Sequence, residues 1–148
     1  MATTTAICTS FKGEVLKATH NLDAGGNALK FALIKVAPAG TYGAGSTNYS
    51  NITGNSDEVA SGGGYTTGGA AMTNSGVSTS GTTGIADFGN LSWAAATFST
   101  TAGMMYNTTQ ANRSIATWDF GGTQSVSGAT FTITMPASGA GTSLIRIA

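Results

Sequence analysis

The feature that most constrains the fold is a series of short segments in which apolar residues alternate with other residues, each followed by Gly, Asn or Ser. In the segment at 28–36, ALKFALIKV, Leu29, Phe31 and Leu33 fall on one face of an extended chain and Lys30 on the other. A period of two residues is the pattern of a β-strand with two different faces. The sequence therefore predicts a protein built mainly from strands.

Similar segments recur about every 10 residues, separated by turn-forming residues. We predict strands at 70–80, 83–88, 91–99, 103–107, 113–120, 129–135 and 143–147, and a shorter one at 58–60. About eight short strands with such turns are typical of a β-sandwich, a jelly roll or a small barrel. We expect one domain over residues 1–148, an antiparallel β-sandwich or jelly roll.

One short helix is expected near the N-terminus, in TSFKGEVLKATHNL. Ser10 is a candidate N-cap, and Phe11, Val15 and Leu16 form an apolar stripe at helical spacing. The helix is predicted to end before the glycines that begin at Gly25. Residues 1–9 are expected to form an extended arm that carries little of the core, and residues 38–57 a long surface loop.

Composition excludes several classes of function. Six basic and six acidic residues give a net charge of zero, so the chain lacks the basic surface that nucleic-acid binding needs. No apolar segment approaches the roughly 20 residues that span a bilayer. The single Cys8 and single His20 leave no disulfide framework or cysteine-cage zinc site, and we expect no cofactor.

The carboxylates offer two candidate sites. Asp57 and Glu58 are neighbours, and strand alternation is expected to point their side chains apart. Asp87 and Asp119 each precede Phe-Gly, in IADFGN and TWDFGG. They would either form a paired acidic or hard-cation site or each start a turn by binding nearby backbone N–H groups, and we favour the turns.

Two further patterns have a structural and a functional interpretation. Trp93 and Trp118 would form a sugar-stacking platform if they were exposed, but core packing is the interpretation we favour. The clusters SGGGYTTGGA and FGGTQ lack the lysine and the following helix of a phosphate-binding loop, so their glycines are interpreted as turn residues.

The surface must consist largely of Thr, Ser, Asn and Gly, because 25 Thr, 15 Ser and 22 Gly accompany only 8% charged residues. Sheet edges without charged side chains pair readily with other strands. We therefore predict an assembly subunit that forms homo-oligomers or binds a lattice. Its contacts are expected in the N-terminal segment, the 38–57 loop and the C-terminal strand, at Thr3, Thr4, Thr5, Ile7, Tyr42, Tyr49, Ile52, Leu144, Ile145 and Ile147.

The chain also resembles a family of small β-rich structural proteins of tailed phages. The most specific segments are EVASGGGYTTGGA and the closing LIRIA. The resemblance extends over essentially the whole chain and includes KFALIKV, IADFGNLSWAAATF and NRSIATWDFGG. It implies a non-enzymatic virion component, assembled in the cytoplasm of a bacterial host.

Within the virion we expect a head decoration, or cement, protein whose partners are the phage major capsid protein and further copies of itself, without nucleic acid or membrane. Because little of such an attachment would be ionic, we expect it to be insensitive to salt. The alternatives are a tail- or fibre-associated subunit and, from another class, a carbohydrate-binding β-sandwich module that uses the two tryptophans.

Overall fold

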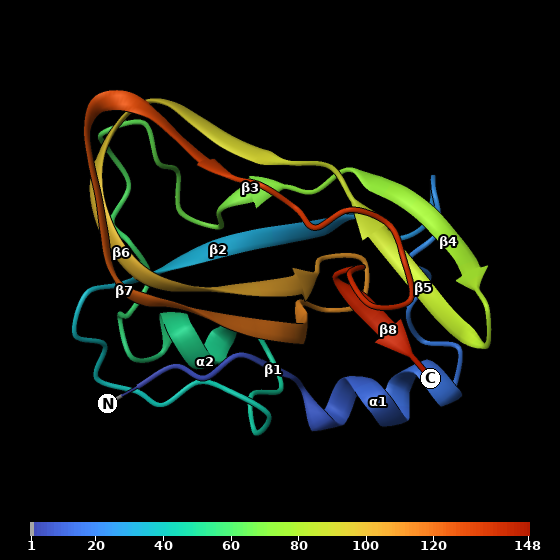
Figure 1. Cartoon of the computed structure of the whole chain (residues 1–148). Coiled ribbons are helices and arrows are strands. Elements are labelled where there is room, and N and C mark those ends of the chain that lie inside the picture. Colours follow the sequence, from blue (N-terminus) through green and yellow to red (C-terminus); the bar gives the residue numbers. More distant parts are fainter. Residues whose placement is uncertain (1) are drawn as a thin grey trace.

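The computed structural model describes residues 2–148 as a two-layered, mainly β fold with two short helices (Figure 1). This confirms the predicted fold class, a small antiparallel β-sandwich. The elements are β1 (Ala6–Ile7), α1 (Thr9–Leu16), β2 (Leu29–Lys35), α2 (Ser50–Thr53), β3 (Ala70–Ala71), β4 (Asn74–Ser80), β5 (Thr83–Phe88), β6 (Leu91–Asn107), β7 (Arg113–Ile133) and β8 (Ile145–Ile147).

The strands form two antiparallel sheets. The larger has the order β1-β7-β6-β2-β3, and the smaller has the order β4-β5-β8. β2 lies inside the larger sheet and is buried on both faces. Its residues Leu29, Phe31 and Leu33 belong to the main core cluster, whereas Ala32 and Ile34 belong to a second cluster behind the sheet. The alternation predicted for this segment is therefore confirmed.

One long hairpin, β6–β7, replaces the four shorter strands predicted at 91–99, 103–107, 113–120 and 129–135. Thr100 pairs with Gln124 and Ala102 with Asp119, so residues 120–123 bulge opposite one residue of β6. Gly121 and Gly122 adopt positive φ there, at 76° and 152°, which side chains disfavour. The hairpin bends over at this bulge, so its two parts lie in different layers (Figure 1).

Helix α1 is shorter than predicted, because it ends at Leu16 and not near Gly25. Its N-cap is Cys8, without a side-chain capping bond, and not Ser10. The helix stops where Ala18 takes a left-handed conformation, φ 55°. The chain then turns back, and the side chain of His20 contacts Phe11 and Glu14.

The N-terminal segment packs against its own domain. Cys8 is fully buried, Thr3 is 7% exposed, and Ala6 and Ile7 pair with Thr117 and Ala116 of β7. The expectation that this segment carries little of the core was wrong, because its residues complete both the sheet edge and the main core cluster.

Candidate functional site: a cleft between α1 and the smaller sheet

An apolar cleft of about 400 Å³ lies between α1 and the β4-β5-β8 sheet. It continues into an adjoining space of about 360 Å³, and Phe11, Val15, Ile145 and Ile147 line both parts. Openings of this size and apolar character are the usual form of binding sites. The cleft is therefore the first candidate for a functional surface.

Exposed apolar side chains gather on this cleft. Among the described residues, the large hydrophobic side chains with substantial exposure are Leu16 (89%), Ile147 (59%), Val77 (52%) and Val36 (39%). The first three line the cleft, and only Val36, which follows β2, does not. Single exposed apolar residues are ordinary, but a group around one opening indicates a contact surface.

The cleft is open because the sheet that forms its floor lacks a side chain at Gly84. Gly84 pairs with Ile147, and Ala86 pairs with both Ile145 and Val77, so these residues share one face of the sheet. A Cβ added at Gly84 would have as its nearest neighbour the Ile147 carbonyl oxygen, at 3.8 Å. A Cβ at this position is therefore accommodated without a backbone clash, and a larger side chain is expected to extend into the cleft that Gly84 lines.

The helical wall of the cleft is fixed to the rest of the domain through Glu14, whose carboxylate accepts hydrogen bonds from His20 and Arg113. His20 Nδ1 faces the Asn107 amide nitrogen at 2.9 Å, so Nδ1 is the acceptor and Nε2–H donates to Glu14. Burial opposes ionisation of Glu14, but these bonds outweigh it and lower its pKa. Both ring nitrogens of His20 are engaged, which leaves neither free to act as a base.

Charge is distributed unevenly along the cleft. Lys12 and Arg146 line its adjoining part, and Lys17 directly follows Leu16 at the end of α1. The ion pairs among the described residues involve only Lys35, Arg113 and His20, so Lys12, Lys17 and Arg146 have no acidic partner in this part of the chain. Arg146 donates a hydrogen bond to the Ala140 carbonyl. Among the described residues, the one carboxylate side chain that lines the cleft is Asp23. It lies in the other part of the cleft and accepts a hydrogen bond from Val77 N at 3.1 Å.

Beside the cleft, the outer edge of β8 is open. Among the described residues β8 pairs only with β5, and a depression of about 270 Å³ lies between it and β1 and β7. Ile7 of β1 and Arg146 of β8 line both this depression and the adjoining part of the cleft. The two spaces therefore adjoin at Ile7 and Arg146, and together they are called the interval beside β8.

The carboxylates Asp57 and Glu58 point apart, as predicted, and each takes part in a separate cluster of hydrogen bonds. Asp57 accepts bonds from Tyr42 and from the backbone N–H groups at 39 and 40, and it pairs with Lys35 Nζ at 3.2 Å. Glu58 accepts bonds from Tyr65, at 2.7 Å, from Tyr49, and from the N–H at 68. Both carboxylates hold loops in place. Because both oxygens of each are occupied by these bonds, neither is placed to act as a catalytic acid or base.

Asp87 and Asp119 lie in different sheets, so the structure does not bring them together as a paired site. Asp119 accepts a hydrogen bond from the nearby Gly121 N at 3.0 Å, as predicted, but the two residues lie at a bulge inside β7 and not at a turn. The prediction was wrong for Asp87, which lies inside β5 and does not start a turn.

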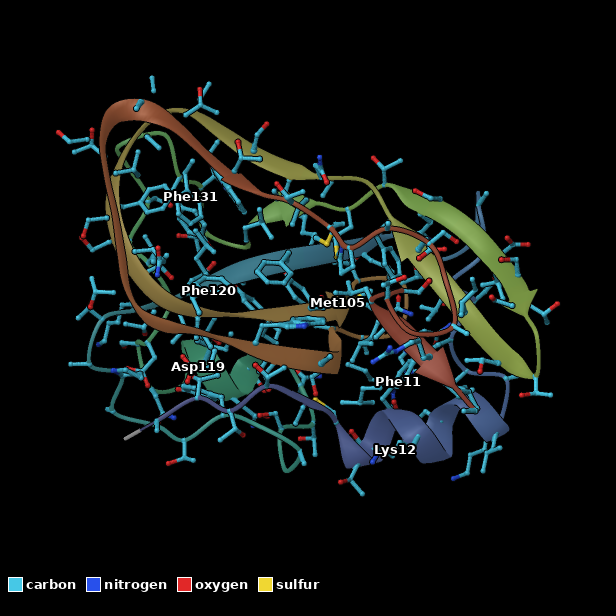
Figure 2. All side chains as sticks on the ribbon, viewed as in Figure 1. Phe11, Lys12, Met105, Asp119, Phe120 and Phe131 are labelled. Atoms are coloured by element: carbon cyan, nitrogen blue, oxygen red, sulfur yellow. The ribbon has the colours of Figure 1, made fainter. Side chains whose placement is uncertain are left out.

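Trp93 belongs to the core, which confirms the interpretation we favoured. It is 6% exposed and contacts the rings of Tyr65, Phe98 and Phe131. Figure 2 shows Phe131, together with Phe120, in the space between the two layers. Trp118 is half-buried, and its ring centroid lies 5.5 Å from that of Phe31. The two tryptophans do not form one exposed platform.

The structure separates the predicted contact residues into three groups. Thr3, Tyr42, Ile52 and Ile145 are buried in their own domain; Ile7, Tyr49 and Leu144 are half-buried; Thr4, Thr5 and Ile147 are exposed.

Of the predicted contact residues, Ile7, Ile145 and Ile147 line the cleft. Sequence reasoning missed Leu16, Val77 and Gly84. One signal was present, since Leu16 lies beside Lys17 at the end of an amphipathic segment, whereas nothing local identifies Gly84.

Within residues 2–148, no group of three or more His, Cys, Asp or Glu side chains is placed to hold a metal ion. No helix in the same part of the chain has the length and apolar character needed to cross a bilayer. Comparisons with protein-family models, with curated proteins and with solved structures find no match to this chain.

Proposed function

We propose that this chain is a non-enzymatic structural subunit of a tailed-phage virion, and specifically a decoration protein that binds the major capsid protein on the outside of the head. The observation that carries the proposal is the outer edge of β7. From Phe120 to Ile133 it has no strand partner in the described part of the chain. The same residues include no Lys, Arg, Asp, Glu or Pro.

Soluble proteins usually protect such an edge with charge or proline, because it pairs with other chains. Bulges at 120–123 and near Gly128 interrupt this edge, but Gln124–Ser127 and Phe131–Ile133 stay regularly paired with β6 on their inner side. An uncharged edge is tolerable in a subunit that is covered after assembly. Weak contacts of this kind gain strength when they are repeated over a lattice.

A tail- or fibre-associated subunit would need the same open edges, so it is the second candidate. The carbohydrate-binding alternative required two exposed tryptophans, and Trp93 is buried. It therefore has no structural observation in its favour.

The proposal is tested on purified particles of the phage that encodes the chain, by quantitative mass spectrometry. We expect a copy number that matches the capsid lattice. A copy number that matches the tail would overturn the decoration role in favour of the second candidate, and absence of the protein from particles would overturn the virion role.

A further inference from the structure

We infer that the cleft between α1 and β8 binds an acidic, extended segment of a partner protein, which adds as a strand to the outer edge of β8. This inference rests on the proposed role as an assembly subunit, and it adds the surface and the chemistry of the bound segment. Four observations support it: the open edge, the apolar cleft, the unpaired cations and the engaged acids of the chain itself.

The open edge favours a peptide over a lipid or another amphiphile. The interval beside β8 consists of a space of about 360 Å³ between α1 and β8 and a neighbouring space of about 270 Å³ between β8, β1 and β7. Only a polypeptide brings the N–H and C=O groups that complete a strand edge. Alternate side chains of the added strand would then enter the apolar part of the cleft, lined by Phe11, Val15 and Ile147.

The unpaired cations favour an acidic segment. Lys12 and Arg146 line the interval and Lys17 lies at the end of α1, while the nearest carboxylate of α1, Glu14, is already bonded to His20 and Arg113. Figure 2 shows Phe11 on the side of α1 that faces β8, with Lys12 next to it on the helix. Complementary charge selects the partner and disfavours a basic segment.

The segment is expected from a different protein and not from a second copy. A second copy would have to offer an extended acidic strand, but the strands of the described residues carry at most one acid each, Asp87 in β5 and Asp119 in β7. Asp57 is fully buried and Glu58 is bonded to Tyr49 and Tyr65. Asp23 lies in a turn and already binds Val77 N.

The test measures binding of three synthetic peptides to the full chain by calorimetry: EVEVEVE, its basic counterpart KVKVKVK, and an EVEVEVE with N-methylated backbone, which keeps all four glutamates but lacks backbone donors. We expect EVEVEVE to bind and the other two to bind at least about tenfold more weakly. Hydrogen exchange should slow at residues 145–147 when EVEVEVE binds.

Variants of the protein locate the site. Leu16→Ser removes an exposed apolar contact, and Gly84→Leu fills the cleft, so both should weaken binding of EVEVEVE by about tenfold or more. Val36→Ser, which changes the one exposed large apolar side chain away from the cleft, should leave binding unchanged. The double variant Lys12→Glu, Arg146→Glu should bind KVKVKVK more tightly than EVEVEVE. Its binding of KVKVKVK would also show that the variant is folded.

Equal binding of the acidic and basic peptides, slowed exchange at β7 in place of β8, or binding to anionic phospholipid vesicles without any peptide binding would each overturn the inference. These assays use the isolated protein, so they are independent of the particle count. Presence in particles without peptide binding would overturn the inference alone, and peptide binding by a protein absent from particles would overturn only the virion role.

Discussion

At the scale of single residues, the buried carboxylate of Asp57 fixes the 38–57 loop to β2 through Tyr42, two backbone N–H groups and Lys35. Burial alone would raise its pKa, but the hydrogen bonds from Tyr42 and from the N–H groups at 40 and 39, together with Lys35, outweigh burial and lower the pKa to about 2. A carboxyl pKa below its ordinary value of 3.8 stabilises the folded state above about pH 4, and this contribution is lost as the pH falls towards 2.

We therefore expect Asp57→Asn to lower the free energy of unfolding by at least about 2 kcal/mol at neutral pH. It should also flatten the acid side of the stability profile, measured by urea unfolding at several pH values. Asp119→Asn is the control, because that carboxylate is exposed and accepts only the N–H of Gly121. Equal effects of the two substitutions would show that Asp57 does not hold the 38–57 loop as described.

At the scale of elements, the long hairpin packs closely on β2 at Gly103. A Cβ added there would lie 2.1 Å from Cε1 of Phe31, whose ring is buried and packs against Trp118. We expect Gly103→Ala to destabilise the protein by about 1–3 kcal/mol through overpacking.

Gly13→Ala provides the matched control. Gly13 lies within α1, and an added Cβ meets nothing within 4 Å. The same substitution should therefore stabilise the protein by about 0.5–1 kcal/mol. Thermal unfolding of both variants measures the two signs, and a neutral Gly103→Ala would contradict the close packing of β6 on β2.

The elements also show what sequence patterns can and cannot predict. The alternation at 28–36 fixes β2 to within one residue at each end, and Thr83–Phe88 matches the predicted segment 83–88. The β6–β7 hairpin was predicted as four pieces because its bulges interrupt the period of two, although the backbone stays paired through them. Bulges depend on the partner strand, so one segment alone does not reveal them.

The cleft was not predicted for a related reason. Its walls come from α1 and the neighbouring turn near Asp23 and from β8, which lies more than 100 residues further along the chain. Its floor is open because one strand residue is Gly84. In the sequence, Gly84 resembles the turn glycines around it. Only the register of β5 against β8, which pairs Gly84 with Ile147, shows that Gly84 lies on the surface of the cleft.

At the scale of the whole molecule, the N-terminal segment completes the domain. Cys8 N donates to the Ile115 carbonyl at 2.9 Å, Thr4 N donates to the Tyr42 carbonyl at 2.8 Å, and Cys8 is fully buried. We expect deletion of residues 2–8 to prevent cooperative folding, as seen by circular dichroism during heating. A deletion variant that unfolds like the full chain would instead support the sequence-based prediction that this segment is an extended arm with little part in the core.

The free edge of β7 predicts self-association of the isolated protein. Ser127 is exposed and lies on a regularly paired part of β7, and lysine on an edge opposes pairing with another edge. Ser127→Lys should therefore shift oligomers towards monomers in sedimentation velocity, with a change in stability below about 0.5 kcal/mol. Ser138→Lys adds the same charge in an exposed loop and should not change the oligomers.

The dependence on salt concentration distinguishes binding at the β7 edge from binding at the cleft, because different forces act at the two surfaces. Self-association through β7 joins residues without charge, so raising NaCl should leave it unchanged. Binding of EVEVEVE at Lys12 and Arg146 is partly ionic, so it should weaken as the screening length falls from about 10 Å at 0.1 M to about 3 Å at 1 M. Sedimentation and calorimetry on one salt series measure both. If the oligomers dissociate at high salt, the assignment of the β7 edge to uncharged strand pairing is wrong. If peptide binding does not change with salt, the assignment of the cleft to charge-assisted binding is wrong.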